Sequence, residues 1–177
     1  MSALDKIIDN QESIDLSGND IKTITNDGAR VLSYHELVNY NSLDEVLGDN
    51  EAMILLYETR ENFGHWVAVF KVDDDTVEFF DPYGLQMDQE LNYATYNNEP
   101  TLTNLVKASG YKVIVNKLRL QTFKKDINTC GRWASIRIKF RSISLRDFQT
   151  LFKNNRHYNP DFWVSTLTYL FTYNKTQ

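Results

Sequence analysis

The apolar residues of the first half of the chain change their spacing from helical to extended. Ser17 stands before GNDIKTIT and Ser33 before YHELVNYNSLDEVLG, which are polar caps ahead of helical patterns, and Gly48 ends the second pattern. Runs rich in branched and aromatic residues follow at 52–58, 65–72 and 76–80. The pattern therefore predicts two N-terminal helices and then an antiparallel meander of three strands.

The second half of the chain begins with one more helix and strand and then becomes helical. A helix is expected over 101–109, ending at Gly110, and a strand over 111–115. From Cys130 onward the apolar residues recur at helix spacing, as they do again in LRDFQTLF and FWVSTLTYLF. The order of elements predicts an α+β domain, with a mixed, mainly antiparallel sheet of about five strands flanked by helices.

The chain shows no linker, repeat or low-complexity tract, and its 42% hydrophobic content supplies a substantial core. One domain over residues 1–177 is expected. It has an N-terminal helical part (1–50), a sheet part (51–121) and a C-terminal helical part (122–177) whose helices start at the cysteine. The basic and apolar regions of a signal peptide are missing from the N-terminal residues, and no apolar run is long enough for a membrane span. We therefore expect a monomer that works inside a cell or a particle and not in a membrane.

Cysteine, histidine and charge narrow the chemistry. A single cysteine cannot form an internal disulfide, and the three histidines are too far apart for a zinc motif, so neither a metal nor a cofactor is predicted. The net charge of −5 argues against a protein that coats nucleic acid, but residues 117–141 hold 8 basic residues and 1 acidic residue. This basic band could bind nucleic acid. A solvated basic face balanced by the acidic N-terminal half is the favoured interpretation.

The register of one hairpin predicts that a histidine and an aspartate meet. A three-residue turn at 73–75 would place Asp81 opposite Val67. His65 lies two residues from Val67, so it projects from the same face, diagonal to Asp81. The sequence thus predicts an imidazole beside a carboxylate, whereas a two-residue turn would send the two side chains to opposite faces.

The lone cysteine falls where a helix should begin, in INTCGRWASIRI. Unpaired N–H groups and the helix dipole at Cys130 favour a thiolate, and Lys124, Lys125 and Arg132 act in the same direction. Gly131 is expected to leave space beside the sulfur for a substrate backbone.

These residues cover the roles that acyl transfer by a thiolate requires. His65 would be the base, Asp81 its orienting acid and Cys130 the nucleophile, with the Gln121 side chain and the Cys130 N–H as oxyanion donors. Taken singly, each residue has a more ordinary interpretation: a buried thiol, a surface histidine, a turn aspartate and a solvated glutamine.

The order of the local motifs strengthens the assignment. GHWVAVF, VEFFDPYG, a glutamine and NTCGRWA resemble the adenovirus maturation proteases (adenain) and the ubiquitin-like-protein proteases, most clearly over 54–84 and 118–140. The resemblance implies a fold of the papain-like clan with the chain order His-Asp-Gln-Cys. The last motif is similar to maturation proteases of virophages, Maverick-type elements and large DNA viruses, which implies cleavage of capsid and other virion precursors in the virion or the infected cell.

By the same resemblance, the expected substrate-binding residues surround the catalytic ones: Gly64, Trp66, Asn128 and Gly131. A narrow tunnel walled by Trp66 implies glycine before the scissile bond. The interval from Gln121 to Cys130 is longer than in the resembling enzymes, which makes Asn128 a second candidate oxyanion donor. No second cysteine exists, so the disulfide-linked peptide activation of the human adenovirus enzyme is excluded.

Two other functions fit the same motifs. A deconjugating protease for ubiquitin-like proteins would use the same triad, although the 50 residues before the first predicted strand leave little room for an exosite. A noncatalytic capsid or nucleic-acid-binding protein could retain the fold, but the presence of all four chemical roles argues against it.

Overall fold

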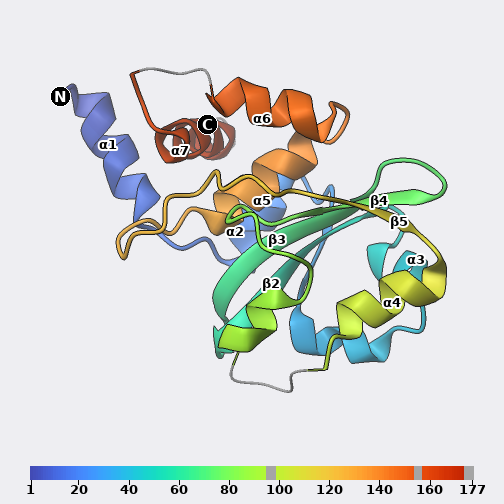
Figure 1. Ribbon diagram of the computed structural model, residues 1–177. Helices are drawn as coiled ribbons and strands as arrows, with labels where there is room; N and C mark the ends of the chain where they lie inside the picture. The colour runs from blue at the N-terminus through green and yellow to red at the C-terminus, as the bar shows by residue number, and fades with distance from the viewer. Residues whose placement is uncertain (95–98, 154–156, 174–177) are drawn as a thin grey trace.

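The computed structural model describes residues 1–94, 99–153 and 157–173, which form a five-stranded mixed sheet with helices on both faces (Figure 1). The strands lie in chain order and are β1 (Arg30–Ser33), β2 (Ala52–Arg60), β3 (Phe63–Lys71), β4 (Thr76–Phe80) and β5 (Lys112–Val115). The α-helices are α1 (Ala3–Glu12), α2 (Gly18–Thr25), α3 (Leu43–Leu47), α4 (Thr101–Ser109), α5 (Cys130–Lys139), α6 (Leu145–Lys153) and α7 (Pro160–Tyr173). Two 3₁₀ helices, η1 (Tyr34–Asn39) and η2 (Gln89–Tyr93), complete the fold. The expected α+β class is confirmed.

The centre of the sheet is the predicted meander, because β2, β3 and β4 pair antiparallel in chain order. Both edges differ from it: β1 pairs parallel with β2, and β5 pairs parallel with β4. β5 had been expected, whereas β1 lies inside the part predicted to be only helical, which is a correction. RVLS has four residues and half-buried neighbours, so its local pattern shows no clear period.

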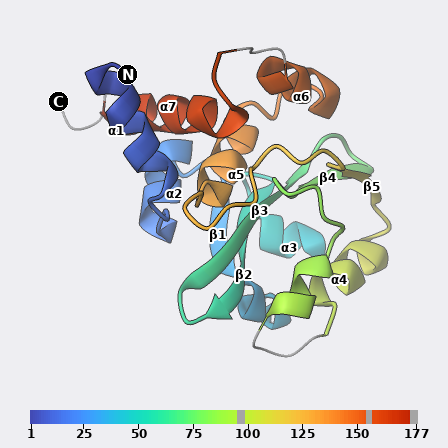
Figure 2. The ribbon, with the colours of Figure 1, turned by 60° about the vertical axis from the view of Figure 1, so that its left-hand side comes forward.

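The helix predicted over 34–48 is two short helices. η1 ends at Tyr40, whose backbone is extended, and Ser42 caps α3 by accepting a hydrogen bond from the Glu45 N–H. Gly48 ends α3 with a φ of 64°, as expected for a glycine after a helix. Helix α1, which the apolar pattern did not reveal, packs against α7 (Figure 2).

The sheet separates two apolar layers, because alternate residues of β2 and β3 point to opposite faces. Trp66, Ala68 and Phe70 lie on the face covered by α5, while Val67 and Val69 lie on the face covered by α3 and α4. Burial of both faces explains why these strands read as continuous apolar runs rather than as alternating ones.

One buried ion pair joins the sheet to the helical layer. The Arg137 guanidinium on α5 donates to both carboxylate oxygens of Glu78 on β4, at 2.7 and 2.9 Å, and both side chains are almost fully buried. Arg137 also donates to the carbonyl oxygens of Phe140 and Ile143. This network fixes α5 relative to β4. None of the helices in the described ranges is both long and apolar enough to cross a membrane.

Candidate active site

The predicted hairpin register is present and brings His65 and Asp81 together. β3 and β4 pair from Ala68 with Phe80 to Lys71 with Val77, which is the register expected from a three-residue turn. The next position places Asp81 at the level of Val67. His65 Nε2 and Asp81 Oδ1 are 3.1 Å apart, and both residues are buried. The predicted meeting of an imidazole and a carboxylate is therefore confirmed.

Asp81 is held by the turn that it starts, Asp-Pro-Tyr-Gly. The Tyr83 N–H donates to Asp81 Oδ1 at 2.7 Å, and the Gly84 N–H donates to the Asp81 carbonyl oxygen at 2.9 Å. The buried Asn116 side chain donates to the same carbonyl oxygen. Asp81 Oδ2 is buried and has no hydrogen-bond partner among the residues that the structure describes. The carboxylate is thus fixed on one side and unsatisfied on the other.

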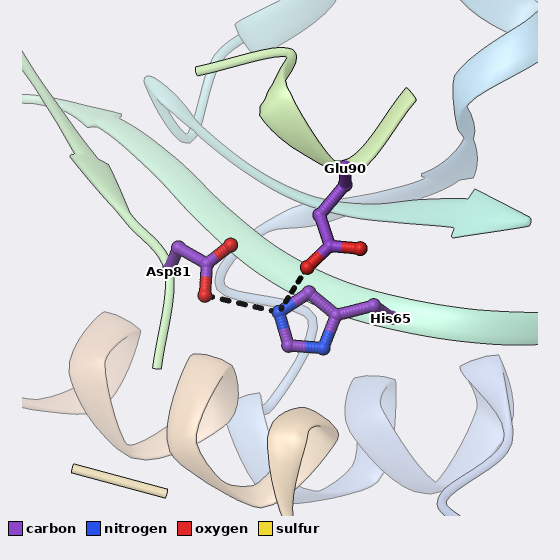
Figure 3. Close-up of side chains that lie close together, drawn as sticks. All are labelled: His65, Asp81 and Glu90. Atoms are coloured by element: carbon purple, nitrogen blue, oxygen red, sulfur yellow. Dashed lines mark hydrogen bonds and ion pairs between the residues drawn. The ribbon is translucent and has the colours of Figure 1, made fainter. Parts of the chain in front are cut away.

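A second carboxylate approaches the same imidazole nitrogen. Glu90 Oε1 lies 3.8 Å from His65 Nε2, and the other ring nitrogen points away from both carboxylates (Figure 3). Burial raises the pKa of Glu90; the charge of His65 opposes this change and that of Asp81 adds to it. Glu90 sits on η2, which Asp88 precedes as the N-cap residue, and Asp88 accepts hydrogen bonds from Tyr34 and Tyr57. The position of Glu90 beside His65 could not be predicted from the sequence, because these hydrogen bonds join residues far apart in the chain.

The three side chains also have the composition of a small metal site. One oxygen or nitrogen atom each from His65, Asp81 and Glu90 lies within 4.8 Å of the others. Imidazole and carboxylates suit a zinc-like ion. A hydrogen-bonded histidine and aspartate explain the same geometry without an ion, because Nε2 already has a partner in Asp81.

Cys130 is the first residue of α5 and is 8% exposed. The start of this helix is anchored from α7, since buried Asp161 accepts hydrogen bonds from the Thr129 hydroxyl, the Trp133 indole and the Thr122 N–H. The predicted position at a helix N-terminus is therefore confirmed. Asp161, which performs the anchoring, lies 31 residues downstream and was not among the candidates.

The electrostatics link His65 to Cys130. Burial alone lowers the pKa of His65, but its hydrogen bond with Asp81 and its interaction with nearby Cys130 outweigh burial and raise the pKa well above its ordinary value. The Tyr83 ring stacks on the imidazole, with centroids 4.7 Å apart and planes at 12°. The structure therefore places the three residues predicted as a triad in one cluster.

The two candidate oxyanion donors are both engaged with protein groups. Gln121 is buried, and its amide donates to the Tyr83 hydroxyl and the Ile127 carbonyl oxygen. Asn128 donates from its backbone to the Glu12 carbonyl oxygen at 2.7 Å and from its side chain to the Ser13 carbonyl oxygen at 3.0 Å. Asn128 thus ties the loop before Cys130 to the N-terminal segment.

Both predicted glycine positions have a packing role. A Cβ on Gly131 would lie 3.1 Å from Trp66 and 3.2 Å from Leu16, so the space expected for a substrate is occupied by protein on that side. A Cβ on Gly64 would lie 1.9 Å from the Tyr57 carbonyl oxygen, so close pairing of β2 and β3 requires glycine there. The expectation of open space beside Gly131 is corrected.

Trp66 lies beside the cysteine helix, as a tunnel wall would, but is mostly buried. Its indole donates to the Leu16 carbonyl oxygen at 3.2 Å, and its outer edge borders a hollow of about 330 Å³ between α2 and β1. A second hollow, of about 430 Å³, is lined by Tyr83, Glu90 and Phe123 among others. Tyr83 and Glu90 are neighbours of His65, so this hollow lies near the cluster.

The basic band is weaker at the surface than in the sequence. Arg137 is buried in its ion pair with Glu78. Arg132 is also buried, and it donates hydrogen bonds to Thr168 and Gln11. The Arg132 guanidinium thus connects α5 to α7 and α1. Lys124 and Lys125 remain exposed in the loop before the cysteine.

Fold and site together define an α+β protein with a five-stranded mixed sheet and a buried cysteine, histidine and aspartate cluster. The chain is 32% identical over 167 residues to uncharacterized protein V9 of Sputnik virophage, an alignment that covers 89% of this chain and 95% of V9. The chain belongs to the same family as V9. No protein-family model matches the chain.

Proposed function

We propose that this protein is a cysteine endopeptidase of the papain-like clan, with the chain order His-Asp-Gln-Cys. The observation that carries the proposal is the buried cluster in which His65 is hydrogen-bonded to Asp81 and lies near enough to Cys130 for the cysteine to raise its pKa. Those three residues come from β3, the end of β4 and the start of α5. Their convergence is what nucleophilic catalysis by a thiol requires.

The raised pKa of His65 supports a protonated imidazole. The proposed reaction starts from this imidazolium and a Cys130 thiolate. In the first step the Cys130 sulfur bonds to the carbonyl carbon of a peptide. As the C–N bond breaks, His65 gives its proton to the leaving amine, which leaves a thioester. His65 then takes a proton from water, whose oxygen attacks the thioester carbon; the carboxyl product leaves and the thiolate returns. Asp81 orients the imidazole throughout.

Virion precursor polypeptides are the proposed substrates, with cleavage after glycine in a motif of small residues. The buried cysteine and the position of Trp66 beside it support a restricted approach, which favours a residue without a side chain at the scissile bond. The family relationship to a virophage protein supports a viral setting. Capsid maturation accounts for both features.

Paired peptides that differ only in glycine or leucine before the scissile bond test the proposal. The glycine peptide should be cleaved by the parent protein, the leucine peptide much more slowly, and neither by a Cys130→Ala variant. Equal cleavage of the two peptides would refute the glycine preference. Cleavage of ubiquitin-like fusions but not of virion precursors would instead favour a deconjugating protease.

The single cysteine permits a second, independent readout. A peptide carrying a thiol-directed warhead can add only to Cys130, so intact mass reports site occupancy directly. Labelling should be lost in His65→Ala. His35→Ala is the matched control, because His35 also pairs with a carboxylate, that of Glu58 at 2.8 Å, yet lies outside the cluster. Labelling that persists in His65→Ala would contradict the proposed role of His65.

A further inference from the structure

The oxyanion of the proposed reaction needs hydrogen-bond donors beside Cys130, and the side chains expected to supply them are committed elsewhere. Both N–H bonds of the Gln121 amide have acceptors, namely the Tyr83 hydroxyl at 3.1 Å and the Ile127 carbonyl oxygen at 3.3 Å. The Asn128 side chain is directed at Ser13. A different side chain is therefore needed to accompany the backbone N–H at the start of α5.

Tyr83 has the unused proton. Its hydroxyl oxygen accepts from Gln121, and no hydrogen bond among the described residues uses this hydroxyl as a donor. An oxygen that accepts one hydrogen bond can still donate its own proton to another acceptor. Gln121 therefore fixes the hydroxyl while leaving the O–H free for a substrate atom.

Tyr83 also has the right neighbours. Its ring lies parallel to the His65 ring, and its N–H holds Asp81 Oδ1, so one turn positions the acid, the imidazole and the phenol. Burial raises the pKa of Tyr83, and of the surrounding charges that of Cys130 raises it most, followed by Glu90 and Asp81. The phenol consequently stays protonated at any working pH.

We propose that the Tyr83 hydroxyl, oriented by Gln121, is the side-chain donor to the oxyanion, and that Gln121 is a positioning residue. This inference rests on the proposed peptidase function. When the sulfur adds to the carbonyl carbon, the π electrons move to oxygen, and the Tyr83 O–H and the Cys130 N–H donate to it. Preorganised donors of this kind stabilise the transition state more than the bound substrate.

Tyr83→Phe tests the inference, because it keeps the ring on His65 and removes only the hydroxyl. We expect kcat to fall by about 10²–10³-fold with KM little changed, as for loss of one oxyanion donor. A peptide ending in glycinal adds to Cys130 as a hemithioacetal, and its affinity should fall by a similar factor. Binding of a fluorescent uncleaved peptide, measured in a Cys130→Ala background, should stay unchanged. The pH profile of kcat/KM should also be unchanged, since His65 keeps its partners.

Two comparisons separate this role from a structural one. Tyr111→Phe is the matched control, because it removes a hydroxyl bonded to Asp44 far from the cluster, and its kcat should match the parent. As a single substitution, Gln121→Met should lower kcat. In a Tyr83→Phe background the same substitution should lower kcat little further, because Gln121 acts through the Tyr83 hydroxyl. Unchanged kcat and glycinal affinity in Tyr83→Phe, with an active parent, would overturn the inference and leave the peptidase intact. A parent that neither cleaves peptides nor binds glycinal would instead remove the proposed function itself.

Discussion

Two buried carboxylates lie three residues apart at the end of β4, and each is paired with a nitrogen base. Glu78 meets Arg137 with both oxygens, and every oxygen of that carboxylate has a donor. Asp81 meets His65 with one oxygen, while Oδ2 is buried without a partner in the described part of the chain, and Glu90 lies nearby. Both carboxylate oxygens of the first pair thus accept hydrogen bonds, whereas the second pair has one carboxylate oxygen that accepts none from the described residues.

We infer from this difference that the Glu78–Arg137 pair serves the fold, while the His65–Asp81 pair serves the proposed chemistry. A bidentate, fully satisfied pair between β4 and α5 fixes two elements and offers nothing to a ligand. The second pair is different, because an unsatisfied carboxylate lies beside an imidazole whose pKa is raised, near the thiol at the start of α5. Groups with shifted pKa values of this kind are common in active sites. Breaking each pair separately tests this division.

The largest effect is expected from Asp81→Asn. Loss of the orienting carboxylate should lower kcat/KM by about 10³–10⁴-fold. It should lower the free energy of unfolding less than Glu78→Gln does, because one oxygen of Asp81 already has no hydrogen-bond partner among the described residues. Because Asp81 raises the pKa of His65, its loss lowers that pKa, and the imidazolium is deprotonated at lower pH. The alkaline limb of the pH–rate profile should therefore move to lower pH. Stopped assays across pH, with chemical denaturation of the same variant, measure both quantities.

Glu78→Gln should show the opposite division. Removing one partner strands a buried guanidinium, which should lower the free energy of unfolding by about 3–5 kcal/mol. The activity per folded molecule should remain near that of the parent. Replacing both partners, in Glu78→Gln with Arg137→Met, should recover part of the loss. A stable but inactive Glu78→Gln variant would break the proposed division.

Glu90→Gln measures how much Glu90 contributes, besides Asp81, to orienting and charging the His65 imidazole. At 3.8 Å from His65 Nε2, it contributes charge rather than the short hydrogen bond that Asp81 makes. We expect kcat/KM to fall by less than about tenfold, or about 1.4 kcal/mol of barrier. A loss as large as that in Asp81→Asn would show that the orienting acid is Glu90.

The smallest effect concerns a carboxylate outside both pairs. Burial, with the charges of Asp161 and Asp9, raises the pKa of Glu12 to about 7 from an ordinary value of 4.5. The folded chain therefore retains a proton that the unfolded chain releases between these values, so the free energy of unfolding falls as pH rises through that range. Glu12→Gln should flatten this slope. An identical pH dependence of denaturant midpoints in the two proteins would contradict the raised pKa.

The two halves of the site differ in how far the sequence predicts them. The meeting of His65 and Asp81 could be predicted because the length of the turn at 73–75 fixes the register of the hairpin. That register decides which side chains share a face of the sheet. The helix that begins at Cys130 is equally local. Glu90 could not be placed in this way, because η2 is fixed by hydrogen bonds of Asp88 to tyrosines on other elements.

The same reasoning explains the missed elements of the fold. β1 is short and gains its place by pairing parallel with β2, a contact that local spacing does not encode. Asp161 reaches the start of α5 from the far end of the chain. The packing of Leu16 and Trp66 against Gly131 likewise depends on a segment more than one hundred residues upstream.

The proposed peptidase activity depends on Cys130 and His65 acting together. It is tested by intact mass spectrometry of the parent, Cys130→Ala, His65→Ala and His35→Ala proteins, each mixed with a glycine-containing peptide and, separately, with its warhead derivative. We expect cleavage and a single adduct in the parent and His35→Ala, and neither in the other two. No cleavage by the parent, or adduct formation that is equal with and without His65, would contradict it.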